Sequence, residues 1–304
     1  MRIVYLGTPA PAVPPLRALH AAGHDIALVV TQPDRRRSRG AGVDPSPVKV
    51  AALELGLEVR TPQKASEVTE EVRASGATLG VVVAFGQILR PDLLAALPEG
   101  FVNVHFSLLP RWRGAAPVER AILAGDAETG VAVMRMEEGL DTGPVFAEWR
   151  TPIGRQETAG ELSDRLVAMA SQLLVEVLPD ILTLEPRAQE GETTYAKKLQ
   201  PEEFHLDFTR PAQELQWVVQ AGNPRPGAFT TLDGKRLKVL RAHRWMGTDD
   251  DVHTAEPGTV HAKALVTTGR GVLKLDEVQP EGKRPMAGDA WLAGARAVGR
   301  RLAT

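Results

Sequence analysis

The sequence predicts an α/β protein with a Rossmann-like, mostly parallel sheet in its N-terminal domain and a smaller, OB-like β-barrel after it. The N-terminal part alternates short apolar runs with helical stretches, which is typical of parallel strands joined by helices. The run LGVVVA at 79–84 is continuously apolar, as expected for a central strand covered on both faces. The C-terminal part contains several short strand patterns and one helix, which favours a small barrel.

Length and composition set the outer limits of the interpretation. With 304 residues, the chain is long enough for two domains that each bury a core. We predict a first domain over 1–183, a polar linker over 184–201 that ends in a proline, and a second domain over 202–304. The net charge of −2 excludes a globally basic nucleic-acid binder, so any RNA contact must use local patches.

Cysteine and histidine usage argues against a metal centre. The chain has no Cys, which excludes disulfides and thiolate ligands, and its seven His residues lack metal-ligand spacing. No apolar run is long enough to span a bilayer, and the opening MRIVYLGTP predicts a strand rather than a signal peptide. We therefore expect a cytoplasmic protein with no metal and no membrane segment.

The elements of the first domain follow in order from apolar periodicity and turn residues. The expected strands lie at 3–6, 26–30, 58–60, 79–84, 101–105, 130–136 and 145–150. The expected helices lie at 14–22, 47–55, 67–74, 91–96, 118–124 and 158–182. Thr158 and Glu161 have the spacing of a capping box at the start of the last helix. The first turn lacks the GxGxxG fingerprint, so a dinucleotide-dependent oxidoreductase is a weak alternative.

The second domain is expected to combine one helix at 212–221 with short strands. The strand patterns lie at 228–232, 235–244, 258–261, 265–267 and 272–278, and Asp233-Gly234 marks one of the turns between them.

The segment FVNVHFSLLPRWRGAAP, residues 101–117, carries the main chemical signal. Asn103 and His105 lie two residues apart in an extended strand, so their side chains share one face. Strand ends followed by loops are where ligands bind in open α/β sheets. Downstream, the sequence GLDTG places Asp141 within folding reach. An amide, an imidazole and a carboxylate are a plausible apparatus for acyl transfer, although polar structural residues at a strand end are the alternative.

Three segments have local basic character. The proposed loop TQPDRRRSRGAGVDPSPVK, residues 31–49, carries Arg35, Arg36, Arg37 and Arg39 without hydrophobic periodicity. Such a loop is either solvated or in contact with nucleic-acid phosphates. The same two alternatives apply to the linker lysines and to the second domain's basic strand, whose candidate RNA-contacting residues are Lys197, Lys198, Lys235, Arg236 and Lys238.

These motifs together resemble a known family. Asn103-x-His105 followed by SLLPRWRGAAP, with GLDTG downstream, resembles the formyltransferases that use 10-formyltetrahydrofolate. TQPD, PSPVK and the turn at 223–227 resemble the subfamily that acts on initiator methionyl-tRNA. The resemblance covers nearly the whole chain. It implies formyl transfer to the α-amine of methionyl initiator tRNA, and it implies that the basic loop at 31–49 contacts the tRNA acceptor arm.

The resemblance also assigns roles to residues. Asn103 would donate to the formyl oxygen, His105 would add a charged donor, and Asp141 would pair with His105. The residues implied to form the folate site, including the pteridine pocket, are Phe85, Gly86, Ile88, Leu89, Ser107, Leu108, Leu109 and Pro110. Phe106 departs from the small residue that relatives often carry, which predicts a narrower wall beside the site.

For the methionyl-tRNA enzyme we expect a monomer. Two further classes of function compete with this interpretation. A formyltransferase of the same fold could act on a sugar nucleotide or another small amine, although such a substrate needs no arginine run at 35–39. A non-catalytic RNA-binding protein would be a different class, and the net charge and the Asn-His-Asp set argue against it.

Overall fold

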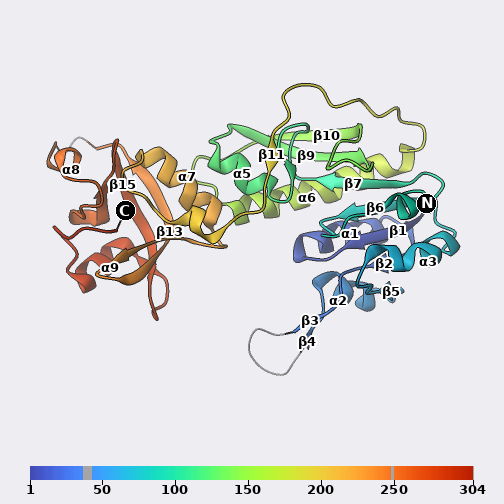
Figure 1. The fold of residues 1–304 in the computed structure, drawn as a ribbon, viewed down its shortest axis with the longest axis horizontal. Coiled ribbons are helices and arrows are strands. Elements are labelled where there is room, and N and C mark those ends of the chain that lie inside the picture. The colour runs from blue at the N-terminus through green and yellow to red at the C-terminus, as the bar shows by residue number, and fades with distance from the viewer. Residues whose placement is uncertain (37–42, 248–249, 304) are drawn as a thin grey trace. The chain divides into compact units, whose positions relative to one another are not determined.

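The computed structural model describes residues 1–36, 43–247 and 250–303 (Figure 1). The candidate residues Arg37 and Arg39 lie outside the described part of the chain. The fold divides into two compact units. The first contains Met1–Gly114, Thr129–Thr151 and Ser163–Ala196, and the second contains Ala115–Glu128, Pro152–Leu162 and Lys197–Thr304.

The first unit is built on a seven-stranded sheet with the order β10-β9-β7-β6-β1-β2-β5. Neighbouring strands from β5 through β7 run parallel, and β9 is antiparallel to β7. The strands are β1 (Arg2–Gly7), β2 (Asp25–Val30), β5 (Val59–Arg60), β6 (Leu79–Val83), β7 (Phe101–His105), β9 (Glu128–Arg135) and β10 (Val145–Pro152). This arrangement confirms the predicted α/β class with a mostly parallel sheet.

The central strand of this sheet is buried, as its sequence predicted. Every residue of β6 is buried, which is the pattern of a strand covered on both faces. Gly80 makes room for its neighbour, because a Cβ built there would lie 2.0 Å from the Phe101 ring. The Phe101 ring therefore fills the space that a larger residue at 80 would occupy.

Helices connect the strands of the first unit, as expected for parallel pairs. The helices of this part of the chain are α1 (Val13–Ala21), α2 (Pro47–Glu54), α3 (Thr69–Ala74), α4 (Pro91–Leu94) and α6 (Ala159–Val177), with 3-10 turns at Ala10–Ala12, Ala65–Val68 and Leu178–Asp180. Two short pairs complete it. One pairs β3 (Arg35–Arg36) with β4 (Val43–Asp44), inside the stretch expected to be a loop, and the other pairs β8 (Arg113–Gly114) with β11 (Tyr195–Ala196).

The second unit contains a curled antiparallel sheet with the order β12-β13-β15-β14, and β16 pairs with β15. Its strands are β12 (Ala228–Leu232), β13 (Lys235–Trp245), β14 (Leu265–Thr267), β15 (Val272–Pro280) and β16 (Met286–Ala287). Its helices are α5 (Pro117–Leu123), α7 (Ala212–Gly222), α8 (Asp250–Thr254) and α9 (Gly288–Ala295), with 3-10 turns at Pro201–Phe204 and Ala262–Ala264.

Several elements of the second unit depart from the sequence prediction, which contained neither α8, β16 nor α9. The strand expected at 258–261 forms only isolated bridges, from Thr259 to Arg301 and from Val260 to Val266. Helix α9 was missed because it is short and its sequence, GDAWLAGA, begins with a glycine. That glycine is required by packing, since a Cβ at Gly288 would lie 1.9 Å from the Leu275 carbonyl oxygen.

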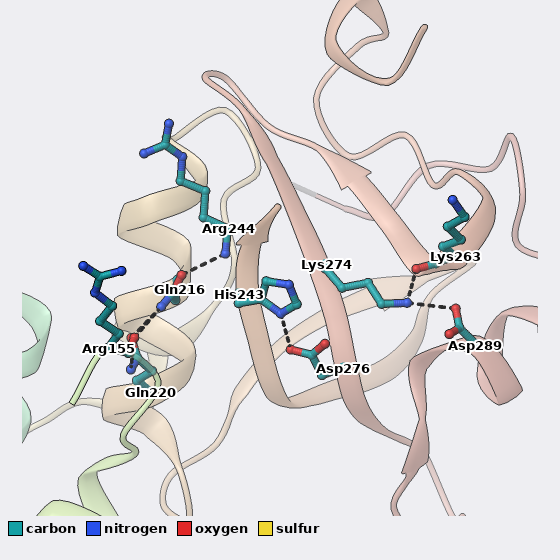
Figure 2. Close-up of polar contacts among 9 residues, drawn as sticks. All are labelled: Arg155, Gln216, Gln220, His243, Arg244, Lys263, Lys274, Asp276 and Asp289. Carbon is teal, nitrogen blue, oxygen red and sulfur yellow. Dashed lines mark hydrogen bonds and ion pairs between the residues drawn. The ribbon is translucent and has the colours of Figure 1, made fainter. Parts of the chain in front are cut away.

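Two glutamines of α7 organise polar contacts inside the second unit (Figure 2). Gln216 and Gln220 are buried, and their amide nitrogens donate to the Arg155 carbonyl at 2.8 and 3.1 Å. The Gln216 oxygen accepts from the Arg244 backbone nitrogen at 2.8 Å. Buried amides need such partners, so these bonds join α7 to the 155 turn and to the end of β13.

The predicted capping box is present at the start of α6. The Thr158 backbone nitrogen donates to Glu161 Oε2 at 2.9 Å, and the Glu161 nitrogen donates to Thr158 Oγ1 at 3.3 Å. The Arg241 guanidinium pairs with the same carboxylate. The backbone bond from Thr158, followed by the Arg241 contact, lowers the pKa of Glu161 from 4.5 to about 2.

This cap leads to a prediction about stability and pH. Glu161→Ala should destabilise the protein by about 1 kcal/mol at neutral pH, because it removes the acceptor of the Thr158 backbone nitrogen, which is one of the two bonds of the capping box, and the partner of Arg241. The pKa of Glu161 is lowered on folding, so the carboxylate stabilises the fold above about pH 4.5 and loses this effect towards pH 2. Chemical denaturation across this range should show the gap between wild type and variant closing as pH falls. The matched control is Glu176→Ala, an exposed glutamate of the same helix, and an equal effect of this control would contradict the cap.

Candidate active site

Strand β7 carries the predicted site at its C-terminal end. Asn103 lies opposite Val82 on one side and Met134 on the other, and His105 lies opposite Ala132. Val102 and Val104 are buried on one face, so the alternation of the strand places Asn103 and His105 together on the other face. Because β7 is paired with β6 on one side and β9 on the other, the backbone that carries Asn103 and His105 is fixed within the sheet.

His105 is buried, with 4% of its surface exposed, and both ring nitrogens face acceptors. Nε2 lies 2.8 Å from the Trp112 carbonyl oxygen, so this nitrogen carries a proton and donates it. Nδ1 lies 3.6 Å from Asp141 Oδ2, a distance for an ion pair with the protonated ring rather than for a hydrogen bond. The structure therefore brings together His105 and Asp141, as the sequence predicted.

Asp141 has a second contact that fixes its carboxylate. Its Oδ2 accepts a hydrogen bond from the Gly114 backbone nitrogen at 2.8 Å. Gly114 has a φ of 121° and lies so close to the Ala196 carbonyl oxygen that a Cβ would approach it to 2.8 Å. Only glycine suits that position, which explains the RWRG sequence at this turn.

Asn103 differs from His105 in its contacts. Within the described ranges, its side-chain amide makes no hydrogen bond with the protein. It is half-buried, so its N–H groups are available to a bound molecule. A free amide donor beside a fixed imidazole can stabilise negative charge that develops on an oxygen during a reaction.

The loop after β7 is held from within and from a distant segment. The Ser107 hydroxyl donates to the Arg111 carbonyl oxygen at 2.6 Å and is fully buried. The Trp112 nitrogen donates to Thr194 Oγ1 at 2.9 Å. Sequence analysis missed Thr194, because nothing local in a polar stretch signals a bond to a residue 82 positions earlier.

The two leucines of this loop pack against the sheet. Leu109 clusters with Ala132, Met134 and Val145. Leu108 lies over Gly130, where a Cβ would approach its side chain to 2.5 Å. Pro110 is also buried, and Phe106 is half-buried.

The turn after β6 contains the other residues predicted to bind folate. Phe85 and Leu89 are only 2% and 5% exposed and belong to the core of the first unit, whereas Ile88 is 86% exposed. The Phe85 carbonyl oxygen accepts from Thr8 Oγ1 and from Gln32 Nε2, each at 2.9 Å. This turn therefore exposes the Ile88 side chain, whereas Phe85 and Leu89 lie in the core.

A cavity of about 710 Å³ lies beside this turn. Gly86 and Ile88 line it, together with Gln32, Lys64 and Arg90. Asn103, His105 and Asp141 are not among the residues that line it.

The candidate RNA-contacting residues fall into separate segments. Arg35 and Arg36 form β3 opposite Asp44 and Val43. Lys197 and Lys198 are exposed, and their backbone carbonyls accept from Arg120 at 3.1 and 3.4 Å. On β13, Lys235 and Arg236 are exposed and Lys238 is half-buried; the Arg236 guanidinium lies 3.7 Å from the Phe229 ring centroid.

A second cavity, of about 540 Å³, lies within the second unit and has cationic residues in its lining. Arg155, His243 and Arg244 contribute to this lining. Figure 2 shows the guanidiniums of Arg155 and Arg244 pointing away from the buried glutamines. Lys274, drawn in the same view, does not line this cavity and is paired with Asp289 at 2.9 Å. Sequence analysis did not single out Arg155, which lies in a turn with no other basic residue beside it.

The described residues contain neither a cluster of metal ligands nor a membrane-spanning helix. In residues 1–36, 43–247 and 250–303, no group of three or more His, Asp or Glu side chains could hold a metal ion. No helix in this part of the chain is long and apolar enough to cross a membrane.

Comparison with protein families identifies the class. The family described as formyl transferase matches residues 1–178, and the family described as formyl transferase, C-terminal domain, matches residues 198–296. The chain belongs to the formyl transferase family, which confirms the predicted resemblance.

Its relatives narrow this class. A methionyl-tRNA formyltransferase of Paracoccus denitrificans is 46% identical over 289 residues, covering 94% of this chain and 95% of the relative. One from Halorhodospira halophila is 47% identical over 306 residues, covering 98% of this chain and 97% of the relative. Within its family, the chain therefore groups with the methionyl-tRNA formyltransferases.

Solved structures with the same fold are more distant. HypX from Aquifex aeolicus in complex with tetrahydrofolic acid has a TM-score of 0.66 at 16% identity, covering 99% of this chain and 48% of that protein. The sugar 3N-formyl transferase WlaRD, in the presence of dTDP and 5-N-formyl-THF, has a TM-score of 0.68 at 16% identity, covering 93% of this chain and 99% of that protein. These likenesses show the formyltransferase fold.

Proposed function

We propose that this protein transfers the formyl group of 10-formyltetrahydrofolate to the α-amine of methionyl initiator tRNA. The observation that carries the proposal is the match over nearly the full length, at 46–47% identity, to methionyl-tRNA formyltransferases. The Asn103, His105 and Asp141 set at the end of β7 supplies the chemistry that acyl transfer requires.

The proposed reaction uses each of these groups. The amine nitrogen attacks the formyl carbon, and negative charge develops on the formyl oxygen. The Asn103 amide donates to that oxygen. The His105 ring, whose Nε2 donates to the Trp112 carbonyl and whose Nδ1 faces Asp141, stabilises the same charge as an imidazolium rather than by a direct hydrogen bond. When the tetrahedral intermediate collapses, the bond between the formyl carbon and N10 of the folate breaks. The amine loses one proton and N10 gains one.

The donor is proposed to be a reduced folate because two neighbours of the same fold were solved with tetrahydrofolic acid or 5-N-formyl-THF. Exposed Ile88 and the backbone of 107–110 are proposed to contact it, with Phe85, Gly86 and Leu89 shaping the turn. Mostly apolar walls with a few placed polar groups suit such a ring.

The acceptor is proposed to be initiator tRNA, bound through local basic groups because the net charge is −2. The proposed contacts are Arg35, Arg36, Arg37, Arg39, Lys197, Lys198, Lys235, Arg236 and Lys238. We further propose a cytoplasmic monomer, with a catalytic domain over 1–183, a linker over 184–201 and a tRNA-binding domain over 202–304.

The test is formyl transfer from 10-formyltetrahydrofolate to Met-charged initiator tRNA. Formylated methionyl-tRNA as product supports the proposal. A second arm offers amino-sugar nucleotides, because a neighbour of the same fold is a sugar N-formyl transferase. Transfer in that arm alone would replace tRNA with a small-molecule acceptor.

The arginine loop gives a separate prediction. Arg35→Ala/Arg36→Ala/Arg37→Ala should weaken tRNA binding and lower its dependence on salt, by about one unit of log–log slope for each lost phosphate contact. KM for the tRNA should rise while KM for the folate stays constant. The control is Arg17→Ala, an arginine that pairs with Glu54 outside the loop. An unchanged salt slope in the triple variant would remove the loop from the tRNA site.

A further inference from the structure

Gln189 lies in the polar segment assigned to the linker, yet its side chain reaches the candidate active site. Its Nε2 donates to the backbone carbonyls of Asp141 at 2.9 Å and of Gly143 at 2.7 Å. Its Oε1 accepts from Arg113 Nε at 3.0 Å and from Arg113 Nη2 at 2.6 Å. One half-buried amide thus joins two loops that are distant in sequence.

The two loops joined by Gln189 are those that place the Asp141 carboxylate. Arg113 precedes Gly114, whose N–H donates to Asp141 Oδ2. Asp141 itself has a φ of 49°, in the left-handed region that residues other than glycine adopt only occasionally. A backbone in that region persists only where surrounding contacts hold it, and the two Gln189 donations hold its carbonyl and that of Gly143.

The backbone on each side of Gln189 is fixed to the same unit. Before it, Arg187 exchanges two backbone bonds with Val145, at 2.7 and 2.8 Å. After it, Tyr195 and Ala196 pair in parallel with Arg113 and Gly114. The amide therefore has little freedom to leave its partners, unlike a side chain on a mobile surface segment.

We propose that Gln189 is a positioning residue for formyl transfer, holding the Asp141 loop against the Arg113 turn so that the carboxylate faces His105. This inference rests on the proposed function for its kinetic consequence. The nitrogen half of the amide carries the role, because it bonds the residue that bears the carboxylate. The oxygen half orients the amide through Arg113.

Kinetics of three variants test this role. Gln189→Ala should lower kcat about 10- to 100-fold and leave KM for folate and for tRNA within about twofold, because a misplaced carboxylate affects the reacting geometry and not the binding of substrates. Gln189→Glu retains the acceptor for Arg113 but loses both donors, so its kcat should fall at least as far as that of Gln189→Ala. Glu190→Ala, which changes an exposed neighbour with no hydrogen bond or ion pair in the described chain, should keep wild-type rates.

A double-mutant cycle separates positioning from general weakening of the fold. Since Gln189 acts through Asp141, adding Gln189→Ala to Asp141→Asn should lower kcat by less than about threefold further. Losses that multiply would overturn the proposal, as would a Gln189→Glu variant with wild-type kcat.

Hydrogen exchange provides a readout that needs no activity. In Gln189→Ala, peptides that cover 113–114 and 139–143 should exchange at least about tenfold faster, with the rest of the sheet unchanged. Unchanged exchange would refute the positioning contact whatever the reaction. Faster exchange with an undiminished kcat would refute its role in catalysis. If the wild type transfers no formyl group to methionyl-tRNA, the proposed function fails, while exchange still decides whether Gln189 holds the loops.

Discussion

Asn103→Ala is expected to lower kcat for formyl transfer about a hundred- to a thousand-fold, the loss seen when one donor to a developing oxyanion is removed. The Asn103 amide has no hydrogen-bond partner in the described chain, so its removal leaves no protein group unpaired and should leave the fold intact. KM for both substrates should change little if the donor acts mainly in the transition state. Steady-state rates with each substrate varied in turn give the measurement.

Asn103→Asp is the matched variant, because it retains the shape of the side chain and replaces the N–H donors with a carboxylate oxygen. Its kcat should fall at least as far as that of Asn103→Ala, since a carboxylate repels the charge that forms on the formyl oxygen. Full activity in Asn103→Ala would show that the amide does not contact the reacting oxygen.

Asp141→Asn should lower kcat by about a hundred- to ten-thousand-fold, up to the loss seen when the carboxylate that orients a catalytic histidine is replaced by its amide. The replacement can still accept from the Gly114 nitrogen through its amide oxygen, so the loop should hold its place. What it removes is the negative charge of the carboxylate, whose Oδ2 lies 3.6 Å from His105 Nδ1. Circular dichroism and thermal melting should match wild type while the rate falls.

The control for Asp141→Asn is Glu138→Gln, which removes one negative charge from an exposed position nearby in sequence. Its kcat should equal that of wild type. A comparable loss in both variants would show that the general charge of this segment matters rather than the contact with His105.

The sequence was informative wherever a local pattern determines backbone conformation. The buried run at 79–83 is a central parallel strand, and the alternation in β7 places Asn103 and His105 on one face. Thr158 and Glu161 form the expected capping box. These features depend on neighbouring residues and on which face meets the core, so periodicity alone predicts them.

The sequence predicted less well which individual side chains are buried. Three apolar residues of the turn after β6 had one expected role, but Phe85 and Leu89 enter the core and Ile88 faces outward. Likewise, residues 258–261 have a strand pattern but find only isolated bridging partners. Hydrophobicity indicates that a residue prefers burial, but the path of the chain determines whether a partner lies beside it.

By itself, the sequence determined the strand that bears Asn103 and His105, the polar loop that bears Asp141, and the family to which they belong. Only the tertiary structure showed that Gln189 and Thr194 contact the turn at 112–113 across 76 and 82 residues of sequence. The physical reason is that a hydrogen bond requires two groups within about 3 Å. Local residue patterns specify a strand or a turn, whereas only the complete fold places two such distant segments side by side.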